Sequence, residues 1–285
     1  MTSGVMGWPL ASGYHLGMNT SPIGEHLKTW RKRRHLSQLD LALDAEISTR
    51  HLSFIETGRS RPSRDMVLHL AGHLDIPLRE RNVLLVAAGF APEFPERSLD
   101  DPGLDAARRA VDVVLRGHEP FPALAIDRHW TLVRANRILP VFLEGVSEEM
   151  LAPPVNVVRL SLHPDGLASR IVNYRQWRQH IVERLRHQVD VSADPVLIDL
   201  LDEIDRFPMP RQAAPPVPGP DLGGVAIPLQ VRTAEGILSV YSTTTIFGTP
   251  VDITLAELAI ESFFPADDAT AAAFRRYAEA LAPPL

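Results

Sequence analysis

The first third of the chain carries short runs in which apolar residues recur every three or four positions, which is the period of an α-helix. Ile23, Leu27 and Trp30 form one such face, with a basic cluster around it. Further runs of this kind follow up to position 90, separated by very short connections. The pattern predicts a compact all-α head of five short helices over residues 21–90.

Serine residues mark where several of these helices begin. Ser37, Ser48 and Ser63 each stand directly before an apolar run, where a hydroxyl can accept a hydrogen bond from a backbone N–H of the first turn. Gly58 follows another run, at a position where a helix end favours a left-handed residue. The two central helices are predicted at residues 38–45 and 49–57. The residues expected to pack beneath the turn between them are Leu39, Ile47, Leu52 and Ile55.

Two short helices joined by a tight turn form the unit with which many proteins read DNA. The first helix braces on the backbone of the duplex, and the second enters the major groove with its N-terminal side chains foremost. Arg50 lies at that end and suits a bidentate contact with guanine, while the arginines after Gly58 are expected to contact phosphate. The candidate DNA contacts here are Ser48, Thr49, Arg50, His51, Ser53, Arg59, Arg61 and Arg64.

On the segment LSQLDLALDAEISTRHLSFIETGRSRPS and its flanks, residues 23–76 resemble the XRE family of helix-turn-helix regulators. The resemblance implies that Gln38 contacts DNA phosphate or an adjacent base, and that Arg31 forms a structural ion pair with Glu56. Glu46 occupies the turn position where that family usually has glycine. A non-glycine residue in the left-handed conformation costs about 1 kcal/mol, so we expect a slightly altered turn.

Beyond position 118 the pattern changes to strand-like runs of β-branched and aromatic residues, interrupted by helices. A tight turn at Asp127–His129 is predicted to join the first two strands, and LHPDG at 162–166 is interpreted as another turn. Residues 119–285 are therefore predicted to form an α+β domain with an antiparallel sheet. The predicted strands are Ala123–Ile126, Trp130–Arg134, Val225–Val231, Ile237–Phe247 and Leu255–Phe264, and the predicted helices are Asn136–Leu143, Asn173–Val189, Asp194–Asp205 and Asp267–Leu281.

Three segments lie outside these two units. Residues 1–20 are rich in Gly and Ser and are predicted to be disordered, with Met18 as an alternative start. Residues 91–118 are predicted to be a proline-containing linker followed by a connecting helix at Leu104–Arg116. Phe207–Gly224 holds six prolines and is predicted to be an exposed loop.

Charge divides the chain in the same place. The overall charge of −6 argues weakly against nucleic acid, but residues 1–90 hold 11 Lys and Arg against 8 Asp and Glu, a net of +3. The remainder holds 18 against 27, a net of −9. A basic head followed by an acidic body fits a DNA-binding unit joined to a different module. No apolar run approaches the length that crosses a bilayer, so no membrane association is expected.

Neither a catalytic nor a metal site is indicated. The absence of cysteine excludes disulfides, thiolate nucleophiles and Cys-based zinc sites. The sequence holds no G-x-S-x-G, H-E-x-x-H, P-loop or G-x-G-x-x-G motif. His180 and His187 share a predicted helix without a carboxylate pair at ligand spacing. We expect no enzyme, although a domain that turns over a lipid-like substrate is one alternative.

The helix after position 173 carries an aromatic face with two interpretations. Tyr174, Trp177 and Ile181 lie on one side of it, and such residues line protein cores and hydrophobic ligand pockets alike. If they are core, the second domain serves only to dimerise the protein, which is the other alternative.

The blocks RERNVLLVAAGFAPEF, GHEPFPALAIDRHWTLVRANR, LHPDG, NYRQW and FGTPVDITLAELAIESFFPAD resemble the MmyB-like regulators and stand in the same order. With the head, the resemblance spans about residues 23–280. It implies a PAS-like ligand-binding domain whose ligand is fatty-acid-like, with no other cofactor. Asn136 follows a predicted strand and could orient the head group of a ligand. The pocket residues inferred on this basis are Trp130, Asn136, Phe142, Tyr174, Trp177 and Phe247.

Together these features predict a ligand-responsive transcription regulator that binds double-stranded DNA. A single helix-turn-helix buries too little surface to be specific, so a homodimer on an inverted repeat is expected. Its expected location is the bacterial cytoplasm, in association with the nucleoid when bound to DNA.

Overall fold

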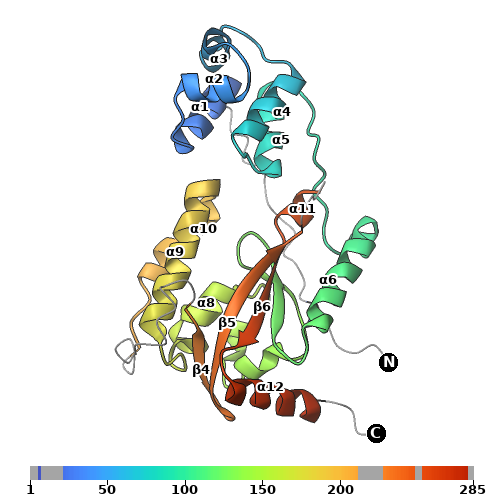
Figure 1. Cartoon of the computed structure of the whole chain (residues 1–285), viewed down its shortest axis with the longest axis vertical. Helices are drawn as coiled ribbons and strands as arrows, with labels where there is room; N and C mark the ends of the chain where they lie inside the picture. The colour runs from blue at the N-terminus through green and yellow to red at the C-terminus, as the bar shows by residue number, and fades with distance from the viewer. Residues whose placement is uncertain (1–5, 8–21, 211–226, 248–251, 282–285) are drawn as a thin grey trace.

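The computed structural model describes residues 6–7, 22–210, 227–247 and 252–281. Within them, a head of five helices stands above a larger part that is built on a curled antiparallel sheet (Figure 1). The disorder predicted for residues 1–20 is wrong at residues 6–7, which pair as a strand with residues 134–135. The rest of that segment and most of the loop predicted at 207–224 lie outside the described residues. The predicted fold class, an all-α head followed by an α+β domain, is confirmed.

The head contains the five short helices that the apolar period predicted. Ser37, Ser48 and Ser63 are the N-caps of the second, third and fourth helices, and each hydroxyl accepts a backbone N–H at 3.1–3.2 Å. The helices are α1 (Ile23–Arg33), α2 (Gln38–Asp44), α3 (Thr49–Glu56), α4 (Arg64–His73) and α5 (Leu78–Ala87).

The apolar faces of these helices meet in one core. Leu27, Leu41, Leu52 and Ile55 are each fully buried in it, and Ile47 packs against its edge. The expectation that Leu39 packs beneath the turn is wrong, because its side chain is 55% exposed. The helical period turns Leu41 and Ala42 of α2 inward and leaves Leu39 on the outer face.

All five helices of the head end in the same way, with a left-handed residue and a backward hydrogen bond. Glycine supplies this conformation after α3 and α5, but Glu46, with φ of 52°, supplies it after α2. The N–H of Ile47 then reaches the carbonyl of Ala42 at 2.9 Å, which is the Schellman arrangement. Glu46 thus takes the left-handed conformation of that position, and the expected alteration of the turn is not seen, because both Schellman hydrogen bonds form. Contact of Ile47 with the core helps to offset the cost.

A buried ion pair ties the head together. Arg31 donates from Nε and Nη2 to the two carboxylate oxygens of Glu56, at 2.6 and 2.9 Å, and from Nη1 to the carbonyl of Leu36. The Gln38 amide donates to the same carboxylate at 2.7 Å. Burial opposes ionisation of Glu56, but the hydrogen bonds from Arg31 and Gln38 outweigh it and hold the pKa of Glu56 below its usual value.

The C-terminal sheet is antiparallel throughout, in the order β1-β3-β2-β6-β5-β4. Its two faces carry separate cores, because successive strand residues point to opposite sides. Leu124 and Ile126 face the larger core, beneath α8 (Val157–Leu162), α9 (Tyr174–Ser192) and α12 (Asp268–Ala280). Ala123 and Ala125 face the other core, beneath α6 (Asp105–Gly117). The strands are β1 (Met6–Gly7), β2 (Ala123–Ile126), β3 (Leu132–Ala135), β4 (Leu229–Thr233), β5 (Gly236–Ile246) and β6 (Ala259–Pro265).

Helices cover both faces of this sheet (Figure 1). Asp194 and Asp267 are the N-caps of the helices that the sequence placed at these residues. The helices are α6 (Asp105–Gly117), α7 (Glu148–Leu151), α8 (Val157–Leu162), α9 (Tyr174–Ser192), α10 (Pro195–Asp205), α11 (Ile253–Ala256) and α12 (Asp268–Ala280).

Four local predictions in this domain need correction. The strand predicted from Leu255 begins at Ala259, because Asp252 caps the short helix α11. The strand predicted from Trp130 begins at Leu132, since Trp130 itself is left-handed. The helix predicted over residues 136–143 is one 3₁₀ turn, and LHPDG continues into a π-helical turn at residues 164–168.

The buried pair between Arg31 and Glu56 should dominate the stability of the head. Arg31→Met leaves the Glu56 carboxylate buried without its partner, so we expect a loss of about 3–5 kcal/mol. Hydrogen exchange of amides in α1 and α3 would report this loss directly. Arg276→Met is the matched control, because its pair with Glu235 is exposed and worth about 1 kcal/mol or less. Equal protection of the head in both variants would contradict this assignment.

Candidate functional site

The N-terminal end of α3 presents the polar residues that the sequence selected for DNA contact. Ser48 is the exposed N-cap, Arg50 is exposed, and Thr49, His51 and Ser53 are half-buried. The ring of Phe54, one turn later, lies under two guanidinium groups: Arg50 at 5.3 Å and Arg59 at 5.9 Å from the ring centre.

Phe54 is a functional candidate that sequence reasoning missed. It holds a predicted base-reading residue and a predicted phosphate-binding residue on one aromatic platform, which restricts both long side chains before DNA arrives. The available signal was an aromatic residue at a half-exposed position of the recognition helix.

The remaining predicted DNA contacts differ in their exposure and in whether their side chains are already paired within the protein. Arg59 and Arg61 are exposed. Arg64 is also exposed, but its guanidinium pairs with Glu93 of the linker. Gln38 is half-buried, and its amide N–H is engaged by Glu56, so in this structure its role is to tie α2 to the buried ion pair.

The predicted ligand residues do not form one pocket. Phe142 and Tyr174 are buried in the larger core, where the Tyr174 hydroxyl donates to the Leu162 carbonyl at 2.9 Å. Trp177 is in the same core, with its indole N–H on the Ser161 hydroxyl at 2.8 Å. Phe247 packs with the other core, on the α6 face.

The side chain of Asn136 is enclosed by backbone groups of the C-terminal domain. It is fully buried, and its Oδ1 accepts the N–H groups of Ala123 and Ile138 at 3.2 and 3.3 Å. Its Nδ2 donates to the carbonyls of Leu115 and Phe121 at 3.2 and 2.8 Å. These four bonds join α6, β2 and the turn after β3, and they occupy the amide that was expected to orient a ligand.

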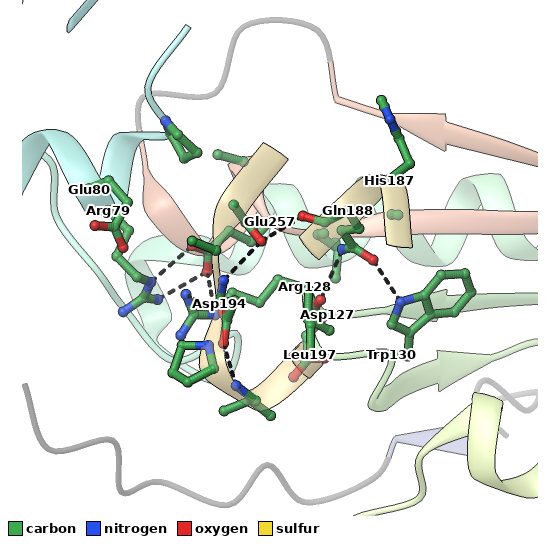
Figure 2. A pocket seen from close by; sticks show the side chains of 18 of the residues that line it. Arg79, Glu80, Asp127, Arg128, Trp130, His187, Gln188, Asp194, Leu197 and Glu257 are labelled. Atoms are coloured by element: carbon green, nitrogen blue, oxygen red, sulfur yellow. Dashed lines mark hydrogen bonds and ion pairs between the residues drawn. The ribbon is translucent and has the colours of Figure 1, made fainter. Parts of the chain in front are cut away.

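Trp130 also lies in the larger core and is only 5% exposed, but unlike the other five it borders an open cleft of about 1030 Å³ between the head and the C-terminal domain. Its indole N–H donates to Gln188 at 2.8 Å, and the Arg184 guanidinium lies 4.7 Å from its ring centre. Figure 2 shows Trp130 and Gln188 at one end of the cleft and Arg79 with Glu80 at the other.

A chain of ion pairs crosses this cleft. Arg79 on α5 of the head donates to both carboxylate oxygens of Glu257 at 2.9 and 3.0 Å, and to Glu96 of the linker at 2.6 and 2.7 Å. Arg128 then lies 3.6 Å from Glu257 and 3.3 Å from Asp194. The head and the C-terminal domain are thus joined by charged groups (Figure 2).

Asp194 anchors the far end of the chain. It caps α10, and the imidazole of His129 lies at 2.9 Å from its carboxylate. Burial opposes ionisation of Asp194, but the hydrogen bond from His129 and the charge of Arg128 outweigh it and hold the pKa of Asp194 below its usual value.

The linker after α5 is bonded on both sides. Asn82 of α5 binds the backbone of Glu93 and Phe94, and the carbonyl of Pro95 accepts the N–H of Ile253 at 2.9 Å. Residues 91–101 have no regular secondary structure, as expected of a linker. The hydrogen bonds just described nevertheless tie this segment to both the head and the C-terminal domain.

Comparison with known families agrees with this division. A helix-turn-helix model of the XRE type matches residues 27–81, and a model described as the MmyB-like transcription regulator ligand binding domain matches residues 107–276. No curated protein matches the chain.

Fold and matches together define a DNA-binding transcription regulator with a ligand-binding domain, rather than an enzyme. Within that class, the chain belongs to the MmyB-like transcription regulators. In the part of the chain that the structure describes, no three His, Asp or Glu side chains gather as a metal site, and no helix could cross a membrane.

The two roles considered for Asn136 give opposite results on substitution. Asn136→Ala should destabilise the C-terminal domain by about 1–3 kcal/mol for each buried backbone group that it leaves unpaired. Hydrogen exchange at β2 and α6 would measure this change. Gln179→Ala is the control, because that amide is exposed and donates to Glu183 on the next turn of α9. Unchanged protection together with weaker ligand binding would restore the ligand role.

Proposed function

We propose that this protein is a sequence-specific regulator that binds its operator through α3 and responds to a small hydrophobic, fatty-acid-like molecule. The observation that carries the DNA part is the ring of Phe54 in α3, against which both Arg50 and Arg59 place their guanidinium groups. Arg50 is placed to read base edges, and Arg59 to contact phosphate. We place its action at the bacterial nucleoid.

Dimerisation belongs to the same proposal. One head offers a single eight-residue recognition helix, whereas specific protein–DNA interfaces bury about 1,000–2,500 Å² of protein surface. Two heads on an inverted repeat, about one helical turn apart, would meet this requirement. Ligand binding changes DNA affinity only if the two conformations of the dimer differ in affinity for the ligand.

Substitutions of Arg50 and Arg59 should distinguish a residue that reads bases from one that binds phosphate. Arg50→Ala is expected to lose about 1–3 kcal/mol on the operator with little change on random duplex, and Arg59→Ala to weaken both duplexes alike. Binding isotherms on upstream DNA and on random DNA at several salt concentrations would measure this. Arg275→Ala, an exposed arginine on α12, is the control and should leave both isotherms unchanged. The reverse pattern would exchange the two roles.

The state of the purified protein tests dimer and ligand together. Native mass spectrometry should show a dimer that carries an acyl molecule, and the extracted lipid, added back, should change affinity for upstream DNA. A dimer without lipid, whose DNA affinity the extract leaves unchanged, would favour the alternative in which the C-terminal domain only dimerises. A monomer both on and off DNA would contradict the inverted-repeat proposal.

A further inference from the structure

We propose that the outer side of α6 is a dimer interface, and that it packs in parallel against the same helix of a second copy of this chain. The inference rests on the proposed function, because it names the surface through which the proposed homodimer forms and the orientation of its two heads. Five residues form this surface, which is called the α6 stripe below: Ala106, Ala110, Val113, Val114 and Gly117.

The α6 stripe is apolar but exposed. Helix α6 already buries one apolar side, since Val111 and Leu115 pack in the core against the sheet. All five residues of the stripe are exposed, including Val113 by 63% and Val114 by 42%. A surface helix ordinarily carries charged and polar residues opposite its buried side. A second apolar side therefore indicates a protein surface that packs against it.

The spacing of the stripe is that of a helix that packs against a helix. Ala106, Ala110, Val113 and Gly117 follow one another at intervals of four, three and four positions, which is the alternation of the a and d positions in a coiled coil. Residues at these intervals keep facing one neighbour along the helix. In a two-fold dimer both copies use the same patch, so α6 of a second copy brings the matching spacing without any further requirement.

The sheet beside α6 widens the surface. Thr245 pairs with Ile260, which belongs to the core beneath α6. Because strand residues alternate between the two faces, Thr243 and Phe264 point to the same side. These two residues and Thr245 are exposed, Phe264 by 43%, and the ring of Phe264 lies 4.8 Å from that of His118 at the end of α6. Stable interfaces bury about 1,200–2,000 Å², so this open part of the sheet supplies area that the stripe alone lacks.

Charged residues of both signs lie around this surface. Arg109 and Arg116 are exposed on α6 next to the stripe, and Asp267 and Asp268 are exposed just after Phe264. In a two-fold dimer each copy supplies both members of every contact, so a surface with both signs suits a second copy. Duplex DNA carries one sign only and fits this surface less well.

The position of α6 decides how the two copies are oriented. Helix α6 lies on the flank of the C-terminal domain, and its N-terminal end, where the linker enters, points toward the head (Figure 1). A two-fold axis beside two parallel α6 helices leaves both heads at the same end of the dimer. One duplex can then contact both recognition helices, whereas antiparallel α6 helices would direct the heads to opposite ends.

Disulfide formation can map this interface, because the chain contains no cysteine. Parallel helices place each stripe residue opposite its own counterpart, so Ala106→Cys, Val113→Cys and Gly117→Cys should each give a linked dimer on mild oxidation. A Cβ at Gly117 meets nothing within 4 Å, so that substitution fits the monomer. Ile198→Cys is the control, at a 41% exposed position on α10, and should give no linked dimer.

Val113→Glu tests how much the stripe contributes to dimer stability. It brings two carboxylates together in the interface, so the dimer dissociation constant should rise by about hundredfold. Sedimentation equilibrium would measure this constant, and circular dichroism would show that the variant stays folded. Ile198→Glu is the matched control and should dissociate like the wild type. The oxidised Val113→Cys dimer should bind the operator as tightly as the wild type does, because both heads remain at the same end.

The outcomes separate this inference from the proposed function. A wild-type dimer that Val113→Glu leaves intact, or that no stripe cysteine links, would overturn the α6 interface while the proposed homodimer stands. A link at only one stripe position, or a linked dimer that does not bind the operator, would overturn the parallel orientation. A monomeric wild type would contradict the proposed homodimer itself. Operator recognition is judged separately, by the Arg50 and Arg59 variants.

Discussion

The geometry of the head depends on one buried carboxylate. Glu56 sits at the end of α3, and it receives Arg31 from α1 and Gln38 from α2. A buried charge with a single partner is a weak source of stability, because desolvation cancels most of the attraction. Here the carboxylate has donors from two other helices, so it fixes the angle between the recognition helix and both helices behind it. The position of Arg50 on the surface follows from that angle.

The sequence was sufficient for the head because its signals there are local. A serine before an apolar run and a glycine after one each specify a contact within the same small unit. The pair between Arg31 and Glu56 was implied by the resemblance to the XRE family. Leu39 was misplaced because a helical period shows that a face is apolar, but not how far it extends around the helix. Phe54 was missed because an aromatic residue on a helix predicts burial more readily than a platform for arginines.

The cleft between the head and the C-terminal domain could not be predicted in the same way, because its residues belong to separate elements that only the fold brings together. Core and pocket use the same side chains, so Tyr174 and Trp130 look alike in sequence. Both prove to lie in the larger core, and Trp130 also lines the cleft. The link from Arg79 to Glu257 spans 178 positions, and nothing local to either residue indicates its partner. Asn136 followed a strand as expected, but its partners are backbone groups.

The arrangement of head and body limits how an effector can control DNA binding. Helices α2 and α3 lie on the side of the head away from the C-terminal domain, whereas α1 and α5 face it (Figure 1). A molecule in the cleft therefore touches neither Arg50 nor Phe54, and it cannot block the major groove by occupying it. What it can change is how firmly each head is held, through Arg79 and the bonded linker. In a dimer, two heads held firmly present their recognition helices at a fixed separation, and two loosened heads lose that spacing. In the proposed dimer, control would therefore act on the separation of the two heads rather than by obstruction of the groove.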